Sequence, residues 1–349
     1  MTSIIKTTYV DSRETGEIVR GVTVKPEKFK RAAIYAVALP IFLTGCEAPL
    51  NLEGVENELE KQVRRTDQFQ GIAVNDTVLV AVGADGLVLT SPLTGLNWQR
   101  HEVNGAPAFV DVAVCPDQSF VALSMDKQVW SSRDNGQSWN ASKLPTPEDV
   151  LDLTCAPDNS IWVVGSFSTV LNSADQGKTW SENTLNEDAM LTGIQFLDNS
   201  TVLVTGEFGL VARSDDGGQN WNVPEYIPND FYTQSAHFPS VEQGWVAGLS
   251  GQIMYTEDGG MTWTQQVTPT ESPLYGFYQA GDRLFAYGDH ATVLEYTGAD
   301  WKRIPNPKMP VYIRDAVQLD NGQLLMAGGF GSLYTLDIAS GDSVQVSQK

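Results

Sequence analysis

The chain has 349 residues, of which 42% are hydrophobic and 9% aromatic, enough to bury a full core, so a wholly disordered protein is excluded. Its formal charge is −21, and residues 47–349 carry 15 basic and 39 acidic residues, a net charge of −24. Because nucleic-acid affinity depends on Lys and Arg neutralising phosphates, nucleic acid is excluded as a partner.

The first predicted element, residues 1–46, has the pattern of a signal peptide. Residues 32–45 form a strongly apolar run that follows a basic cluster and is shorter than the roughly 20 residues of a membrane-spanning helix. The run ends in Leu-Thr-Gly before Cys46, which resembles the bacterial lipobox. We therefore expect a lipid on Cys46 to anchor the chain in a membrane, facing the periplasm or another extracytoplasmic space. An uncleaved anchor or a later translation start remains an alternative, because some 30 residues precede the run.

Residues 47–67 form the second predicted element, a short helical tether. Apolar residues recur there at Leu52, Val55, Leu59 and Val63, with polar residues between them. This is the spacing of one narrow helical face. No chemistry is expected from the tether.

Residues 68–349 carry an internal repeat of about 41 residues. Six tryptophans mark it at spacings of 41, 41, 41, 42 and 38 residues: Trp98, Trp139, Trp180, Trp221, Trp263 and Trp301. A second column, mostly glycine, has seven members: Gly83, Ser124, Gly165, Gly206, Gly248, Gly288 and Gly328. Each period divides into four short strand patterns with turn residues between them. A period of about 40 residues with four strands predicts an all-β, seven-bladed propeller with four-stranded antiparallel blades.

Four repeats contain the Asp-box, S/T-x-D-x-G-x-x-W. Its predicted turn residues are Ser132, Asp134, Gly136 and Trp139; Ser173, Asp175, Gly177 and Trp180; Ser214, Asp216, Gly218 and Trp221; and Thr256, Asp258, Gly260 and Trp263. The Asp and Ser or Thr side chains are expected to bond backbone groups of a tight turn, in which Gly supplies a positive φ and Trp covers the turn. These conspicuous residues are therefore assigned to architecture.

These repeats are similar to the Asp-box, or bacterial neuraminidase repeat, propellers, and most closely to the photosystem II stability and assembly factor family of lipoproteins and its proteobacterial relatives. The resemblance covers residues 69–346. It implies a non-catalytic scaffold, without cofactor, that binds a membrane protein complex. In a non-photosynthetic bacterium the implied partner is a large transporter of the RND type. The family's arginine-rich surface is not matched, because the arginines of residues 47–349 are spread over different repeats.

A secreted glycoside hydrolase of the sialidase type is the alternative function, because sialidases share the Asp-box. Arg303-Ile304-Pro305 is similar to a sialidase element but follows the sixth tryptophan instead of preceding the first box. The three histidines fall in unrelated positions, and no metal-ligand spacing is present. We expect no catalytic residue set and no metal.

A partner-binding patch is predicted on repeats five to seven, where aromatic residues and one arginine gather: Tyr232, Tyr275, Tyr312 and Arg314. Aromatic residues and arginine are frequent interface anchors, although packing between blades is the alternative role for each ring. The cysteines Cys115 and Cys155 end the innermost strands of adjacent repeats. They either form a disulfide across the blade interface or point apart as buried thiols, because geometry and not spacing decides.

Overall fold

The computed structural model describes residues 52–345 apart from 224, 306–308 and 341. The predicted signal peptide and Cys46 lie outside these residues. One α-helix, α1 (Glu53–Leu59), occupies part of the predicted tether. Within the described residues, no helix has the length and apolar character needed to cross a bilayer.

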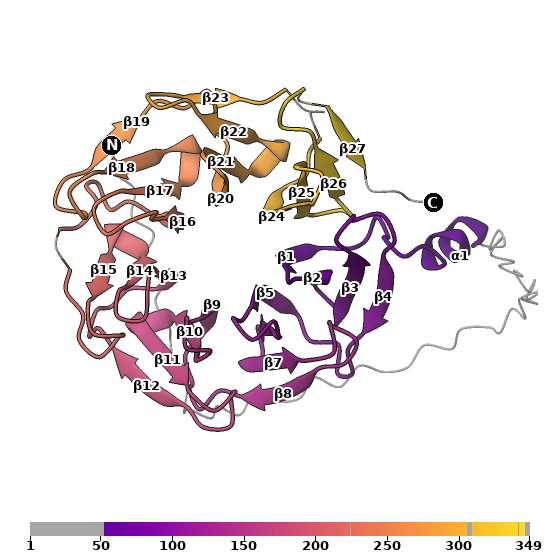
Figure 1. Ribbon diagram of the computed structural model, residues 1–349, viewed down its shortest axis with the longest axis horizontal. Coiled ribbons are helices and arrows are strands. Elements are labelled where there is room, and N and C mark those ends of the chain that lie inside the picture. Colours follow the sequence, from indigo (N-terminus) through magenta and orange to yellow (C-terminus); the bar gives the residue numbers. More distant parts are fainter. Residues whose placement is uncertain (1–51, 224, 306–308, 341, 346–349) are drawn as a thin grey trace, which may run out of the picture. The chain divides into compact units, whose positions relative to one another are not determined.

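The residues after α1 form seven antiparallel sheets arranged in a ring, which confirms the predicted seven-bladed propeller (Figure 1). In each sheet the strands follow one another from the centre outward in chain order. Blades 1 to 3 consist of β1 (Phe69–Val74), β2 (Val78–Gly83), β3 (Leu87–Pro92) and β4 (Gln99–Glu102); β5 (Phe109–Val114), β6 (Phe120–Ser124), β7 (Gln128–Ser132) and β8 (Asn140–Lys143); and β9 (Val150–Cys155), β10 (Ile161–Gly165), β11 (Thr169–Ser173) and β12 (Ser181–Thr184).

Blade 4 has three strands, and the other blades have four. Its strands are β13 (Leu191–Phe196), β14 (Val202–Gly206) and β15 (Val211–Ser214), and a single bridge between Arg213 and Asn222 stands where the fourth strand would pair. The sequence continues with Pro224, which has no N–H to extend a ladder. Blades 5 to 7 consist of β16 (Thr233–His237), β17 (Gly244–Gly248), β18 (Ile253–Thr256) and β19 (Thr264–Gln266); β20 (Leu274–Ala280), β21 (Arg283–Gly288), β22 (Val293–Tyr296) and β23 (Trp301–Arg303); and β24 (Ile313–Gln318), β25 (Leu324–Gly328), β26 (Leu333–Leu336) and β27 (Ser343–Gln345).

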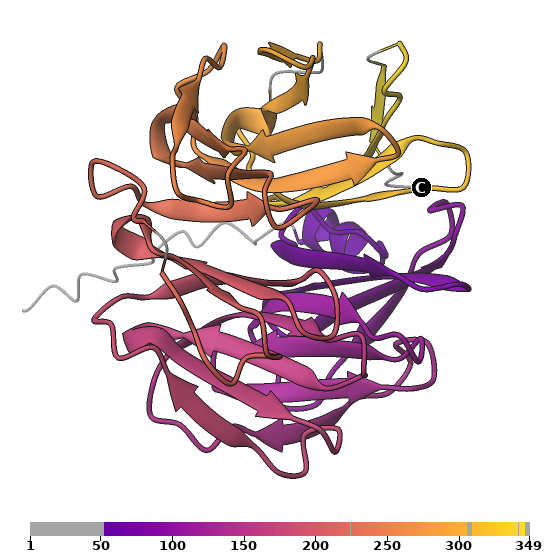
Figure 2. The ribbon, with the colours of Figure 1, turned by 60° about the vertical axis from the view of Figure 1, so that its left-hand side comes forward.

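The hydrophobic core is divided among the seven interfaces between neighbouring blades, whose sheets pack face against face (Figure 2). Each interface has its own buried cluster. Second strands supply much of each cluster, because all five residues of strands such as β6 and β14 are buried. Alternate side chains of a second strand therefore enter the clusters on its two faces, as expected for a sheet covered on both sides.

The four complete Asp-boxes pin the turns after the third strands. In blade 3, Gly177 N donates to Ser173 Oγ at 2.7 Å, and Ser173 Oγ donates to Asp175 at 2.9 Å. Thr179 N donates to Asp175 at 2.8 Å, and hydrogen bonds from Thr179 lower the pKa of Asp175 to about 2. Gly177 has φ of 81°, the left-handed conformation that the turn requires. The same Ser or Thr to Gly bond occurs at Gly136, Gly218 and Gly260.

The ring closes where blade 7 meets blade 1. Gln70 Nε2 donates to the hydroxyl of Tyr312 at 3.0 Å, and that hydroxyl donates to Gln68 Oε1 at 3.0 Å. Gly331 N donates to the carbonyl of Asp67 at 2.8 Å. Val63, from the predicted tether, is buried in the cluster between these two blades. The segment between α1 and β1 is thus packed against the propeller, and the helix itself is shorter than the predicted tether.

Candidate functional site

A cavity of about 230 Å³ lies among the innermost strands of the blades. Each of the seven innermost strands has a β-bulge, a shift in pairing register, directly after its first residue. A bulge leaves one residue unpaired and redirects its side chain. The seven bulged residues all line the cavity: Gln70, Val110, Leu151, Thr192, Gln234, Tyr275 and Arg314. The bulges therefore build the cavity wall.

Arg314 carries the one charge among the bulged residues, and it lies beside an aromatic ring. Its guanidinium carbon is 6.0 Å from the ring centre of Tyr275, in cation–π contact. Both side chains are partly exposed, so they remain accessible from the cavity. Blades 6 and 7 thus place an aromatic side chain and a cation together at the centre of the ring.

Three partly buried carboxyl groups also line the cavity, each one residue after a bulge: Asp111, Asp152 and Asp315. Asp315 accepts a hydrogen bond from Ile72 N at 2.8 Å, and Asp152 accepts one from Ile194 N at 2.8 Å. Asp111 accepts a longer bond from Leu153 N at 3.4 Å. In every case the donor is the backbone of the next blade. These carboxyl groups therefore connect neighbouring blades.

Burial raises the pKa values of these carboxyl groups. It raises the pKa of Asp315 to about 7, and the hydrogen bond from Ile72 N, which lowers this pKa, does not offset it. Burial followed by repulsion from Asp111 raises the pKa of Asp152 well above its ordinary value. Burial also raises the pKa of Tyr287, whose hydroxyl donates to Asp315 at 3.2 Å.

The predicted patch is only partly assembled by the structure. Tyr275 and Arg314 line the cavity together, and Tyr312 lies next to them through its bond to Gln70. Tyr232 does not line the cavity. It is exposed to solvent near Glu207. Burial is the larger cause, and the charge of Glu207 the second, of the raised pKa of Tyr232.

The sequence analysis predicted no group of carboxyl residues at the centre of the ring, where the structure brings Asp111, Asp152 and Asp315 together. Asp315 could have been found, since it directly follows Arg314. The bulges could not be predicted from the sequence. They break the two-residue alternation of a strand, so that two successive residues reach the cavity. The Arg303 of the sialidase-like element lies in β23, an outer strand, away from the cavity.

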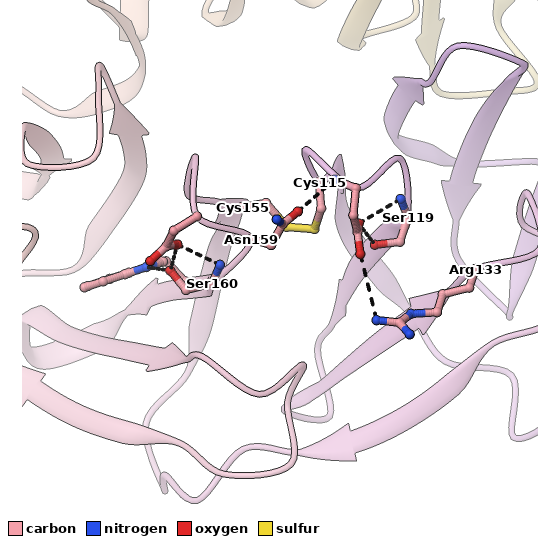
Figure 3. The surroundings of a disulfide bond; sticks show 9 residues. Cys115, Ser119, Arg133, Cys155, Asn159 and Ser160 are labelled. Carbon is pink, nitrogen blue, oxygen red and sulfur yellow. Dashed lines mark hydrogen bonds and ion pairs between the residues drawn. A yellow bond between two sulfur atoms is a disulfide. The ribbon is translucent and has the colours of Figure 1, made fainter.

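The disulfide of the structure joins blades 2 and 3 (Figure 3). Cys115 and Cys155 are bonded, with their Cα atoms 5.1 Å apart, at the ends of β5 and β9. Beside it, Asp117 N donates to Asn159 Oδ1 at 2.7 Å, and Arg133 lies 3.8 Å from Asp117. This end of the innermost strands is opposite to the bulged end. The disulfide reinforces the ring on the far side from Arg314.

Metal ligands are not clustered in the part of the chain that the structure describes, where no group of three or more His, Cys, Asp or Glu side chains is placed to hold an ion. The histidines lie apart: His101 contacts Thr90, His237 contacts Gln279, and His290 lies 3.0 Å from Asp289.

Comparison with known proteins connects this geometry to a family. The family model described as "Photosynthesis system II assembly factor YCF48" matches residues 131–230. Among solved structures, YCF48 from Cyanidioschyzon merolae is similar, with a TM-score of 0.65 and 13% identity over 77% of this chain and 95% of that one. A structure of YCF48 bound to D1 peptide has a TM-score of 0.63 and 13% identity, over 76% and 90% of the two chains.

An enzyme shares the same fold. A virginiamycin B lyase from Staphylococcus aureus has a TM-score of 0.68 and 15% identity, over 78% of this chain and 95% of that one. No curated protein sequence matches the chain. Identities this low show the fold alone, and the sequence match of residues 131–230 adds the family likeness. The chain is a seven-bladed β-propeller similar to the photosystem II assembly factors.

Proposed function

We propose that this protein is a non-catalytic scaffold, anchored at a membrane by lipid on Cys46, that binds a segment of a membrane-protein partner at the mouth of the cavity. One observation carries the proposal. All seven bulged residues face the cavity, and they include a cation and an aromatic ring in contact, Arg314 and Tyr275. Aromatic residues and arginine dominate binding energy at protein interfaces.

The likeness to YCF48 supports peptide binding, since one of its structures holds a D1 peptide. The comparisons provide no observation in favour of a transporter as the partner. A short extended segment of the partner suits the dimensions of the site, because a cavity of about 230 Å³ accepts a few side chains and not a folded domain. Arg314 would bind a carboxylate or carbonyl oxygen of that segment, while the Tyr275 ring packs against it.

Catalysis by the buried carboxyl groups is the competing function, because carboxyl groups with raised pKa values around a cavity are typical of active sites. Asp315, with a pKa of about 7, could act as a general acid. The structure offers another role for it: Asp315 bonds Ile72 N and Ala316 N at 2.8 Å each, and Tyr287 at 3.2 Å. Its oxygens are thus engaged in joining blades, which favours the scaffold.

The test is photocrosslinking of the full chain in its native membrane, with a photoreactive phenylalanine analogue at Tyr275. We expect a crosslink to a membrane protein, reduced about tenfold or more in the Arg314→Ala variant, as for a central interface arginine. Arg133→Ala is the matched control, because Arg133 is exposed at the opposite end of the strands. Equal loss in both variants would contradict the role given to Arg314. Turnover of a glycan panel that Asp315→Asn abolishes while the fold is retained would favour the hydrolase instead.

A further inference from the structure

The loops at the bulged end of the blades present aromatic side chains in a strained conformation. In each blade the loop after the second strand has a non-glycine residue with positive φ, and in blades 3, 4 and 7 this residue is phenylalanine: Phe167, Phe208 and Phe330. Their φ values are 51°, 58° and 57°, and the residues are 59%, 55% and 63% exposed. A bulky residue is unfavourable in this conformation, and exposure of its ring adds a further cost. Such a position is expected to serve binding.

Several loops of blades 3 to 6 at this end contain acidic residues. We define them as the acidic-aromatic sector, comprising residues 166–168, 185–190, 207–209, 225–232, 249–251, 267–273 and 289–291. The sector contains seven carboxylates and no Lys or Arg: Glu187, Asp188, Glu207, Glu225, Asp230, Glu271 and Asp289. Phe330 in blade 7 lies outside the sector.

Hydrogen bonds connect the loops of the sector to one another. Ser168 N donates to Ala189 O at 2.7 Å, Gly209 N donates to Phe231 O at 2.7 Å, and Asp289 N donates to Pro273 O at 2.9 Å. The loops of blades 3 and 4 are thereby fixed to the connection leading into the next blade, and the loop of blade 6 is fixed to the connection between blades 5 and 6. The aromatic and acidic side chains consequently form a preorganised surface, which lowers the entropy lost on binding.

Aromatic and acidic side chains are paired within the sector. Exposed Tyr226 lies near Glu187. Partial burial is the larger cause of the raised pKa of Tyr226, and the negative charge of Glu187 is the second. Tyr232 has the same relation to Glu207. A cation that docks between such a ring and carboxylate gains both a salt bridge and a cation–π contact. Exposed Leu249 and Val267 add apolar side chains to the sector in blade 5.

From this surface we propose that the acidic-aromatic sector binds a basic, amphipathic segment of the partner, with Lys or Arg opposite the carboxylates and apolar side chains between Phe167 and Phe208. The inference rests on the proposed function and specifies the chemistry of the partner. Charge complementarity supports it, because the seven carboxylates of a sector that itself contains no Lys or Arg repel acidic segments and anionic lipid surfaces alike. The chain would thus bind the opposite charge from that expected of an arginine-rich propeller surface.

The experiment uses the full chain in detergent and two fluorescent peptides that differ in charge alone. One alternates lysine with leucine and phenylalanine, and the other has glutamate in place of each lysine. We expect fluorescence anisotropy to show binding of the lysine peptide, weakening as NaCl screens the carboxylates, and no binding of the glutamate peptide. The triple variant Glu187→Gln, Asp188→Asn, Glu207→Gln should bind the lysine peptide about tenfold more weakly, as expected for the loss of three exposed pairs.

Two controls separate the sector from general effects of charge and hydrophobicity. Phe167→Ser with Phe208→Ser should weaken binding, whereas Phe330→Ser, at the equivalent strained position of blade 7, should not. Asp320→Asn, at an exposed turn between β24 and β25, should leave binding unchanged.

Equal binding of both peptides, or equal effects of the sector and control variants, would overturn the inference. Displacement of the lysine peptide by zwitterionic lipid vesicles would also overturn it, by showing that the face is a lipid surface. If neither peptide binds while the Tyr275 crosslink to a membrane protein persists, the inference fails and the proposed function stands. If the Tyr275 crosslink is absent while the lysine peptide still binds, the proposed function fails and the sector still binds a basic segment.

Discussion

Asp315 should make the propeller more stable at mildly acidic pH than at neutral pH. Its pKa is about 7 in the folded protein against an ordinary value of 3.8, chiefly because it is buried. Between these values the folded protein holds a proton that the unfolded chain has released, so stability falls as the pH rises through this window. A difference of this size corresponds to about 4 kcal/mol, with a steepest slope of about 1.4 kcal/mol per pH unit.

The assay is urea unfolding of the full chain in detergent between about pH 5 and about pH 8, in the range where the exposed carboxylates are already ionised. The Asp-box carboxylates of Asp175 and Asp216 have pKa values of about 2. The stability that they contribute to the folded protein is therefore lost only at lower pH. Asp315→Asn should reduce the slope of unfolding free energy against pH by about 1 kcal/mol per unit, whereas Asp320→Asn should not. Identical slopes in the wild type and in Asp315→Asn would refute the reasoning.

Three further variants test the architecture. Ser173→Ala leaves the buried N–H of Gly177 without its acceptor, so it should lower the free energy of unfolding, measured by calorimetry, by about 1–3 kcal/mol. A cost no greater than that of Ser138→Ala, at an exposed position of another Asp-box, would contradict the assigned role. Joint replacement of Cys115 and Cys155 by serine opens a loop with a sequence separation of 40 and should lower stability by up to about 4 kcal/mol, and an unchanged melting temperature would show that the ring alone holds these blades. Gly276→Ala places a Cβ 2.3 Å from the Tyr287 ring and should cost about 1–3 kcal/mol, with a shifted tyrosine titration; no change would mean that Tyr287 can move freely.

The blade number and the Asp-boxes could be predicted from the sequence because they depend on spacing and local turn chemistry. A tryptophan every 41 residues reports a repeated unit whatever its surroundings. The degenerate fourth strand of blade 4 was not predicted, although Pro224 signals where it ends.

The candidate site was harder to predict, because it depends on side-chain direction. Of the predicted patch, Tyr275 and Arg314 are bulged residues that line the cavity. The bulge decides which residue of a strand reaches the cavity: Thr233 is buried, and the next residue, Gln234, lines the cavity. A bulge has no unique residue signature when Val, Leu, Gln, Tyr and Arg all occupy it, so no periodicity reveals it.

The most direct test of the account is the crosslink from position 275 in intact membranes, compared with the same photoreactive residue at position 320 on the opposite end of blade 7. The account predicts a membrane-protein adduct from position 275 alone, lost in Arg314→Ala and retained in Arg133→Ala. Adducts of equal yield from both positions, or none from position 275, would contradict the claim that the cavity mouth is the binding site.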